Sequence, residues 1–235
     1  LLRVNSFEET LNNYKAAYFA VALLIDQASF TKQLNHIFEK KYWDAPALLQ
    51  LLTHYEVSPA VLFQRFNVLS KAFDLHKVFF FRTIHHLKGN RFEIDKELHL
   101  NRKHQPHASG LNEHYCRRWI SLTLLNGLGD TPVAGIQRAM FADTQEEYLC
   151  LAVAQPGTPT PESNVSVMLG ILLDEQARKT IGFLDDPAVP SVMVNVTCER
   201  CSIADCAERA APPTAVLRRE ERKRTLEALK KVNQD

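Results

Sequence analysis

Apolar side chains in the first 75 residues recur at the spacing of an α-helix. After Phe7 they stand three or four residues apart, which places them on one helix face: Leu11, Tyr14, Tyr18, Ala22 and Ile25. The same kind of spacing predicts further helices over residues 30–41, 47–52 and 61–73. The last two follow a short polar side chain and a proline, which is typical of a helix start. We therefore predict a compact helical unit at the front of the chain.

Beyond residue 77 the pattern becomes that of β-strands. Residues 78–84 and 91–94 are rich in aromatic and β-branched side chains, and Gly89-Asn90 between them is typical of a hairpin turn. Three more strand-like runs follow, separated by short loops of turn residues: residues 133–141, 147–154 and 164–173. Because short loops join neighbouring strands, we expect these three to pair antiparallel.

Shorter elements complete the predicted fold. We expect helices over residues 115–125 and 174–184, a strand over residues 191–196, and a charged final helix over residues 216–232. The fold class is α+β, with an antiparallel sheet flanked by helices. The predicted organisation has three parts: a helical unit (1–77), a hairpin with a connecting loop (78–112) and an α+β sensor-like domain (113–235).

The overall composition is that of an ordinary globular protein. Of 235 residues, 46% are hydrophobic, and 28 Lys and Arg against 27 Asp and Glu leave a net charge of +1. Such a balance produces no bulk field that would attract nucleic acid or a membrane. The longest apolar run, residues 16–25, is about half of the roughly 20 residues that span a bilayer. We expect a cytoplasmic protein, and because the chain begins with Leu1 rather than Met, a piece of a longer one.

The five cysteines carry the sharpest chemical signal. Cys198, Cys201 and Cys206 lie within nine positions, so that a tight turn and a short spacer can bring three thiolates to one metal centre. An odd number of cysteines without a secretory signal favours metal binding over disulfides. Cys116, at a predicted loop-to-helix junction, is our fourth ligand. Cys150 lies inside a predicted strand, as a buried small side chain would, and is the weaker alternative to Cys116.

The identity of the metal stays open at this point. Zinc and iron–sulfur clusters both prefer convergent thiolates. Four histidines precede Cys116 and offer a site of three cysteines and one histidine: His99, His104, His107 and His114. Against such a site, an isolated histidine in a polar loop is more often a solvated side chain than a ligand.

Familiar catalytic motifs are missing from the sequence. It contains no His-Glu-x-x-His, no phosphate-binding Gly-x-x-x-x-Gly-Lys-Ser/Thr and no Gly-x-Ser-x-Gly. We therefore expect that this chain is not an enzyme. A hydrolase whose active residues lie upstream of residue 1 is a further alternative.

Several stretches resemble known bacterial domains. Residues 13–24 (NYKAAYFAVALL) and 57–66 (VSPAVLFQRF) look like the helical second half of an ImmA/IrrE-like domain. Residues 113–119 (EHYCRRW) and 198–206 (CERCSIADC), which run on into residues 209–213 (RAAPP), resemble the C-terminal domain of short-chain fatty acyl transcriptional regulators. Those similar proteins control the methylcitrate and glyoxylate pathways. The resemblance covers nearly the whole chain, but the family's N-terminal helix-turn-helix of the Xre type is not in this sequence.

The resemblance implies the effector-sensing region of a transcriptional regulator. Family members are thought to bind short-chain acyl-CoA, and some carry a 4Fe–4S cluster on the cysteines equivalent to those named above. They contact DNA through the N-terminal helix-turn-helix, and we expect a homodimer. The alternative function is a zinc-stabilised interaction or dimerisation module without a small-molecule effector.

An acyl-CoA pocket needs cationic side chains for phosphate and an apolar or aromatic slot for the tail. Tyr18, Arg65 and Arg82 lie in the helical unit and at its junction with the first strand, and we predict that they bind the effector. The alternative is that Tyr18 is a core residue and the arginines are surface residues.

The final helix allows two interpretations. Its seven Lys and Arg side chains suit contact with a DNA backbone. They equally suit a solvated helix with internal pairs such as Glu220–Arg224.

Overall fold

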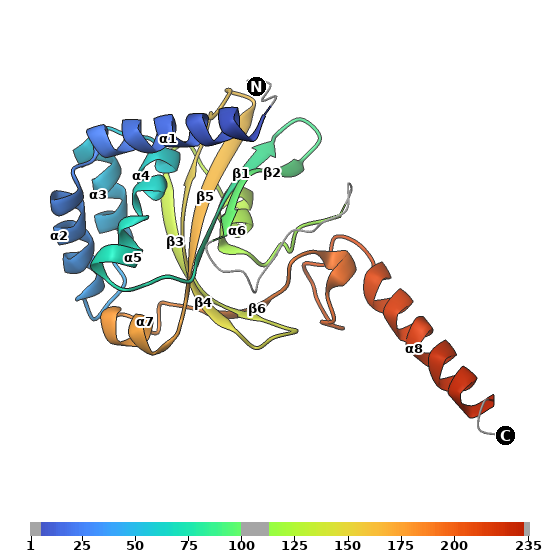
Figure 1. The fold of residues 1–235 in the computed structure, drawn as a ribbon. Coiled ribbons are helices and arrows are strands. Elements are labelled where there is room, and N and C mark those ends of the chain that lie inside the picture. Colours follow the sequence, from blue (N-terminus) through green and yellow to red (C-terminus); the bar gives the residue numbers. More distant parts are fainter. Residues whose placement is uncertain (1–5, 100–112, 233–235) are drawn as a thin grey trace.

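A six-stranded mixed sheet lies at the centre of the protein, as seen in a computed structural model that describes residues 6–99 and 113–232 (Figure 1). The strands are β1 (Val78–His86), β2 (Arg91–His99), β3 (Val133–Phe141), β4 (Glu147–Gln155), β5 (Ser163–Leu172) and β6 (Ser191–Val194). Their order is β2-β1-β5-β4-β3-β6, and neighbours are antiparallel except β3 and β6, which are parallel. The structure confirms the predicted α+β class and the antiparallel pairing of β3, β4 and β5.

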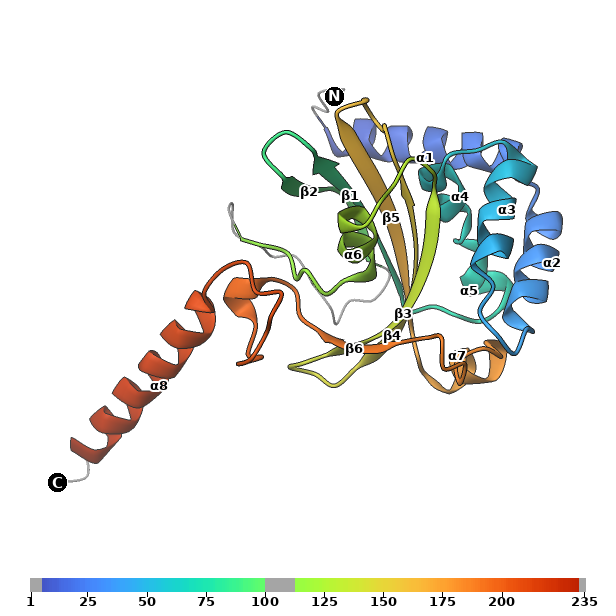
Figure 2. The same cartoon turned by 180° about the vertical axis from the view of Figure 1, so that it is seen from behind.

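Helices cover both faces of this sheet. The helical elements are α1 (Phe7–Leu24), α2 (Gln27–Phe38), α3 (Ala45–Tyr55), α4 (Pro59–Arg65), α5 (Val68–Ala72), α6 (Ile120–Asn126), α7 (Glu175–Thr180), the 3₁₀ turn η1 (Cys198–Arg200) and α8 (Thr214–Val232). Helices α1 to α5 lie on one side and α6 lies on the other, while α8 extends away from the body (Figures 1 and 2). Strands β4 and β5 are accordingly buried along almost their whole length, as expected when both faces are covered.

Two hydrophobic cores result, one on each side of the sheet. The core under α2 to α5 joins helix residues such as Phe38 to sheet residues such as Leu169. The core under α6 is aromatic, and the ring of Trp119 lies edge-on to the rings of Phe79 and Phe81, each 5.8 Å away between centroids. Edge-to-face rings at this distance add stability beyond the apolar area that they bury.

The predicted hairpin belongs to the main sheet. Strand β1 pairs with β2 on one side and with β5 on the other, so that residues 78–99 share a sheet with residues 133–194. Gly89 and Asn90 in the hairpin turn both have positive φ, of 87° and 46°. Glycine and asparagine tolerate this conformation, which is why the pair predicted the turn correctly.

Several predicted helices have other bounds than those observed; the helix predicted over residues 174–184, for example, ends at Thr180. The helix predicted over residues 61–73 is interrupted after Arg65 and forms α4 and α5. The helix predicted over residues 115–125 begins only at Ile120, because Tyr115 forms a β-bridge with Thr197 instead.

Helix α1 buries less of its apolar face than its spacing predicts. Val21 and Ile25 at its C-terminal end are buried, whereas Leu11, Tyr14 and Tyr18 are 36%, 56% and 46% exposed. The helix crosses the end of the helical layer, so that its first turns extend past the core (Figure 1). In the part of the chain that the structure describes, neither α1 nor any other helix has the length and apolar content needed to cross a membrane.

The close packing of β5 against β1 yields a first prediction. A methyl group added at Gly170 would overlap the buried ring of Phe79, its partner in the β1–β5 register. Overpacking of this kind typically costs about 1–3 kcal/mol. We expect Gly170→Ala to lower the free energy of unfolding by that amount, and the urea midpoint with it, while Gly129→Ala, with open space around it, leaves both nearly unchanged. Equal midpoints for the two variants would contradict this packing.

Candidate functional site

Four of the five cysteines line one small hollow at the base of α8. Cys116, Cys198, Cys201 and Cys206 surround it, and all four are free thiols. Cys150 lies in the middle of β4, is fully buried within the sheet and does not line the hollow. The structure therefore brings together the three motif cysteines and the residue predicted to join them.

A short antiparallel pairing of the backbone places Cys116 beside the cysteine loop. Tyr115 and Thr197 form an isolated β-bridge, and the amide of Cys116 donates to the carbonyl of Val196 over 3.1 Å. The chain then turns back through η1, where Cys198 begins the 3₁₀ turn. A pairing between distant segments thus decides which cysteine accompanies the motif.

Charged side chains reinforce the same pairing. The guanidinium of Arg200 donates to the carboxylate of Glu113 at 2.8 Å, and the hydroxyl of Thr197 donates to that carboxylate at 2.8 Å. His114, the residue after Glu113, makes two contacts with Glu199. Its ring Nδ1 lies 2.8 Å from Oε1 of Glu199, and its backbone amide donates to the other carboxylate oxygen at 2.9 Å. These contacts join the segment before Cys116 to the turn that carries the motif.

The histidines considered as zinc ligands do not line this hollow in the described chain. The ring of His114 contacts Glu199 instead. His104 and His107 lie outside the described residues, and the side chain of His99 is also outside them. Within residues 6–99 and 113–232, no group of three or more His, Cys, Asp or Glu side chains already has the geometry of a metal site.

Positive charge borders the four thiols. The guanidinium of Arg209 donates to the carbonyl of Cys198 at 3.1 Å and to the carbonyl of Ile203, which fixes the loop. The amide of Ala210 donates to Sγ of Cys198 at 3.3 Å. Arg117 also lines the hollow. Cations and backbone amides of this kind stabilise thiolates, which are the form that binds metals.

Burial opposes ionisation of these thiols. The pKa of Cys116 is raised to about 11, mainly by burial and to a lesser degree by the neighbouring Cys201 and Cys198, while backbone hydrogen bonds act in the opposite direction. Burial likewise raises the pKa of Cys201 and of Cys150. Without a cation, Cys116 is therefore protonated at neutral pH, and ligation of a metal by Cys116 would release a proton.

The same burial predicts an order of reactivity in the metal-free chain. Cys206 is partly exposed, whereas the other cysteines are buried. We expect iodoacetamide at pH 8 to modify Cys206 first and Cys150 last, and the rate at Cys116 to rise until the pH approaches about 11. Peptide mass spectrometry over time measures the order. Early modification of Cys150 would contradict the placement of β4.

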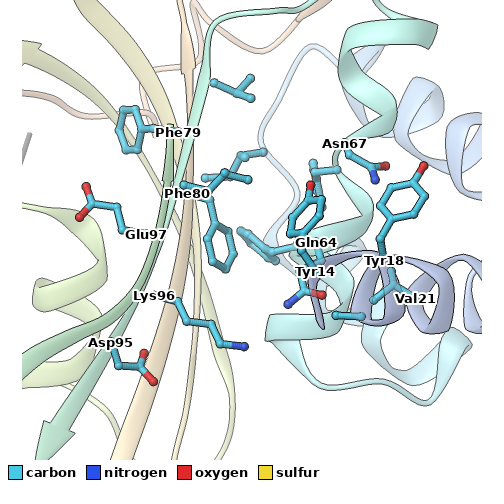
Figure 3. A pocket seen from close by; sticks show the side chains of 16 residues that line it. Tyr14, Tyr18, Val21, Gln64, Asn67, Phe79, Phe80, Asp95, Lys96 and Glu97 are labelled. Carbon is cyan, nitrogen blue, oxygen red and sulfur yellow. The ribbon is translucent and has the colours of Figure 1, made fainter. Parts of the chain in front are cut away.

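A second candidate site lies on the other side of the sheet. A cavity of about 480 Å³ lies between α1, α4 and the β1–β2 hairpin and is partly open to solvent. Its apolar wall comes from these side chains: Tyr14, Tyr18, Val21, Phe63, Phe80 and Leu169. Figure 3 shows Tyr14 and Tyr18 of α1 facing Phe80 of β1 across this space. Its volume and apolar wall are those of a pocket for a small organic ligand.

Few polar side chains point into this cavity. Gln64 and Asn67 approach from the helical side, and the amine of Lys96 approaches from β2 (Figure 3). Lys96 is exposed and forms no ion pair among the described residues. The cavity thus combines an apolar wall with one available cation.

The predicted effector residues have different positions. Tyr18 lines the cavity. Arg82 donates a hydrogen bond from Nε to Oδ1 of Asp95 at 2.8 Å, and this contact raises the pKa of Arg82. Asp95 in turn lines the cavity. Arg65 is buried in α4, its Nε has no hydrogen-bond partner, and it is not part of the lining.

Sequence reasoning missed Tyr14 and Lys96. Tyr14 lies four residues before Tyr18 on the same helix face, and this spacing was a usable signal. Lys96 reaches the cavity because β2 pairs with β1, where it lies opposite Arg82.

No family model, curated protein or solved structure matches this chain. The resemblance to short-chain fatty acyl transcriptional regulators therefore remains a prediction, and function is inferred from the two sites.

Proposed function

We propose that this chain is the effector-sensing region of a bacterial transcriptional regulator, and that it binds short-chain acyl-CoA in the cavity between α1, α4 and β1–β2. The observation that carries the proposal is an apolar cavity of about 480 Å³ with an unpaired lysine, Lys96, directed into it. A short acyl chain suits the aromatic and aliphatic wall. The amine of Lys96 suits a phosphate or a polarised thioester oxygen.

The way in which α1 is attached to the protein suggests how ligand binding in the cavity affects the position of this helix. Only the C-terminal end of α1 is buried, through Val21 and Ile25, while Tyr14 and Tyr18 reach the cavity and remain about half exposed. A ligand that packs against both tyrosines would favour one position of α1 over others. In a regulator with a helix-turn-helix before residue 1, α1 would carry this change toward DNA.

The four thiols support a metal centre as the second part of the proposal. Cys116, Cys198, Cys201 and Cys206, which line the same hollow, would hold a 4Fe–4S cluster or, alternatively, zinc, both of which are bound by cysteine thiolates. A cluster would supply electron transfer, and zinc would supply a structural crosslink. Arg117 and Arg209 offset part of the negative charge of the thiolates.

The alternative function is a zinc-stabilised interaction module without an effector. The exposed apolar side chains of α1, among them Phe7, Phe19 and Leu23, favour it, because large apolar side chains left in water are often covered by a partner.

Calorimetry with short-chain acyl-CoA tests the sensor. We expect Tyr18→Ala and Lys96→Ala each to weaken binding about tenfold, because one removes a packed ring and the other a charge-assisted hydrogen bond. Tyr42→Ala is the control, since Tyr42 is 69% exposed and does not line the cavity. Absence of binding by the unaltered chain would favour the interaction module.

Metal analysis of protein purified without oxygen tests the thiol centre. We expect Cys116→Ser, Cys198→Ser and Cys201→Ser each to lose bound metal, while Cys150→Ala retains it. Iron and sulfide with a brown chromophore would indicate the cluster, and a colourless protein with one zinc would indicate the crosslink. Full metal content in Cys116→Ser would contradict the four-thiol site.

A further inference from the structure

Helix α8 is strongly basic and stands apart from the rest of the protein. It carries seven Lys and Arg side chains and three Glu, a net charge of +4, although the whole chain has a net charge of +1. The remainder of the chain is therefore net negative. Positive charge is concentrated in this helix rather than spread over the surface.

Helix α8 is also exposed to solvent and packs against little of the rest of the protein. Every residue from Leu217 to Lys230 is exposed, and η1 is the element against which α8 mainly packs. Its 19 residues extend about 28 Å at about 1.5 Å per residue, away from the sheet in both views (Figures 1 and 2). A helix this polar gains little from burial, so its exposed face is available to a partner.

The charges on α8 are segregated. At about 100° per residue, five cations fall within an arc of about 140° that contains no acid: Arg218, Arg219, Arg222, Lys223 and Lys230. The three glutamates lie on the opposite side: Glu220, Glu221 and Glu227. The pair Glu220–Arg224 is not formed, and no other ion pair occurs among the described side chains of α8. We call the five cations the basic face.

We propose that the basic face of α8 binds the backbone of double-stranded DNA. Phosphates spaced along a duplex match a row of cations along an extended helix, and guanidinium groups bind phosphate well. Because the proposed contacts are to phosphates, which are the same at every base pair, we expect binding to be independent of sequence. It rests on the charge and exposure of α8 alone and requires neither acyl-CoA nor a metal.

An anionic membrane suits this helix less well. Helices that lie on membranes present a broad apolar face with large side chains. The exposed part of α8 has no aromatic residue, and residues 218–225 contain no aliphatic side chain between Leu217 and Leu226. The same gap breaks the three- and four-residue apolar spacing of a coiled coil, which disfavours pairing with a second copy.

Fluorescence anisotropy with a labelled 20-base-pair duplex, over 50–200 mM NaCl, tests the proposal. Arg219→Gln with Arg222→Gln removes two charges from the basic face. Arg224→Gln with Lys179→Gln removes two charges elsewhere, one on the opposite side of α8 and one on α7. Circular dichroism establishes that both variants keep their helix content.

The unaltered chain is expected to bind duplexes of unrelated sequence with similar affinity. The slope of log affinity against log salt should fall by about 2 in the first variant, and stay unchanged in the control. No duplex binding at 50 mM NaCl, equal losses in both variants, or binding to anionic lipid vesicles in preference to DNA would each overturn the proposal. Acyl-CoA calorimetry on the first variant should match the unaltered chain, so that failure of the sensor and failure of the DNA contact are distinguished.

Discussion

Burial of β4 and β5 on both faces is the constraint on which the remaining structure depends. Neither strand can face water, so one layer of helices must cover each side of the sheet. At Gly170 the packing leaves no room for a side chain, because the ring of Phe79 occupies the space where a Cβ would lie. This two-sided burial fixes β1 against β5 and, through β1, the hairpin that closes the cavity.

The two candidate sites lie on opposite sides of this one sheet. The cavity is formed where α1 and α4 meet the hairpin, and Phe80 of β1 lines it. Its neighbour Phe79 packs on the other side against Trp119, whose indole nitrogen donates to the carbonyl of Asn195 at 3.0 Å, shortly before the cysteine motif. The aromatic layer between the two sites is tightly packed, so that a small displacement within it is not absorbed by empty space.

The loop that carries Cys198, Cys201 and Cys206 forms, together with α8, a third region, which is stabilised by other interactions than the two cores. Hydrogen bonds and ion pairs hold much of this region together, as the contacts of Glu113 with Arg200 and of Arg209 with the loop carbonyls show. A metal on the four cysteines would supply the stability that a small polar loop lacks. It would also fix the base from which α8 extends.

The spacing of apolar and turn residues along the sequence by itself determined most of the secondary structure of this protein. It predicted the helical front, the hairpin at Gly89-Asn90 and the three antiparallel strands, because helix periodicity and turn preferences act over a few residues. The choice of Cys116 as the companion of the cysteine motif rested on a predicted loop-to-helix junction, whereas α6 begins only at Ile120, and a β-bridge between Tyr115 and Thr197 is what places Cys116 beside the motif. Only the tertiary structure decided that the stripe of α1 is half exposed, that His114 contacts Glu199 and that Lys96 reaches the cavity. These outcomes depend on which distant segments pair and on where a layer of helices ends, and a pattern within one segment carries no information on either.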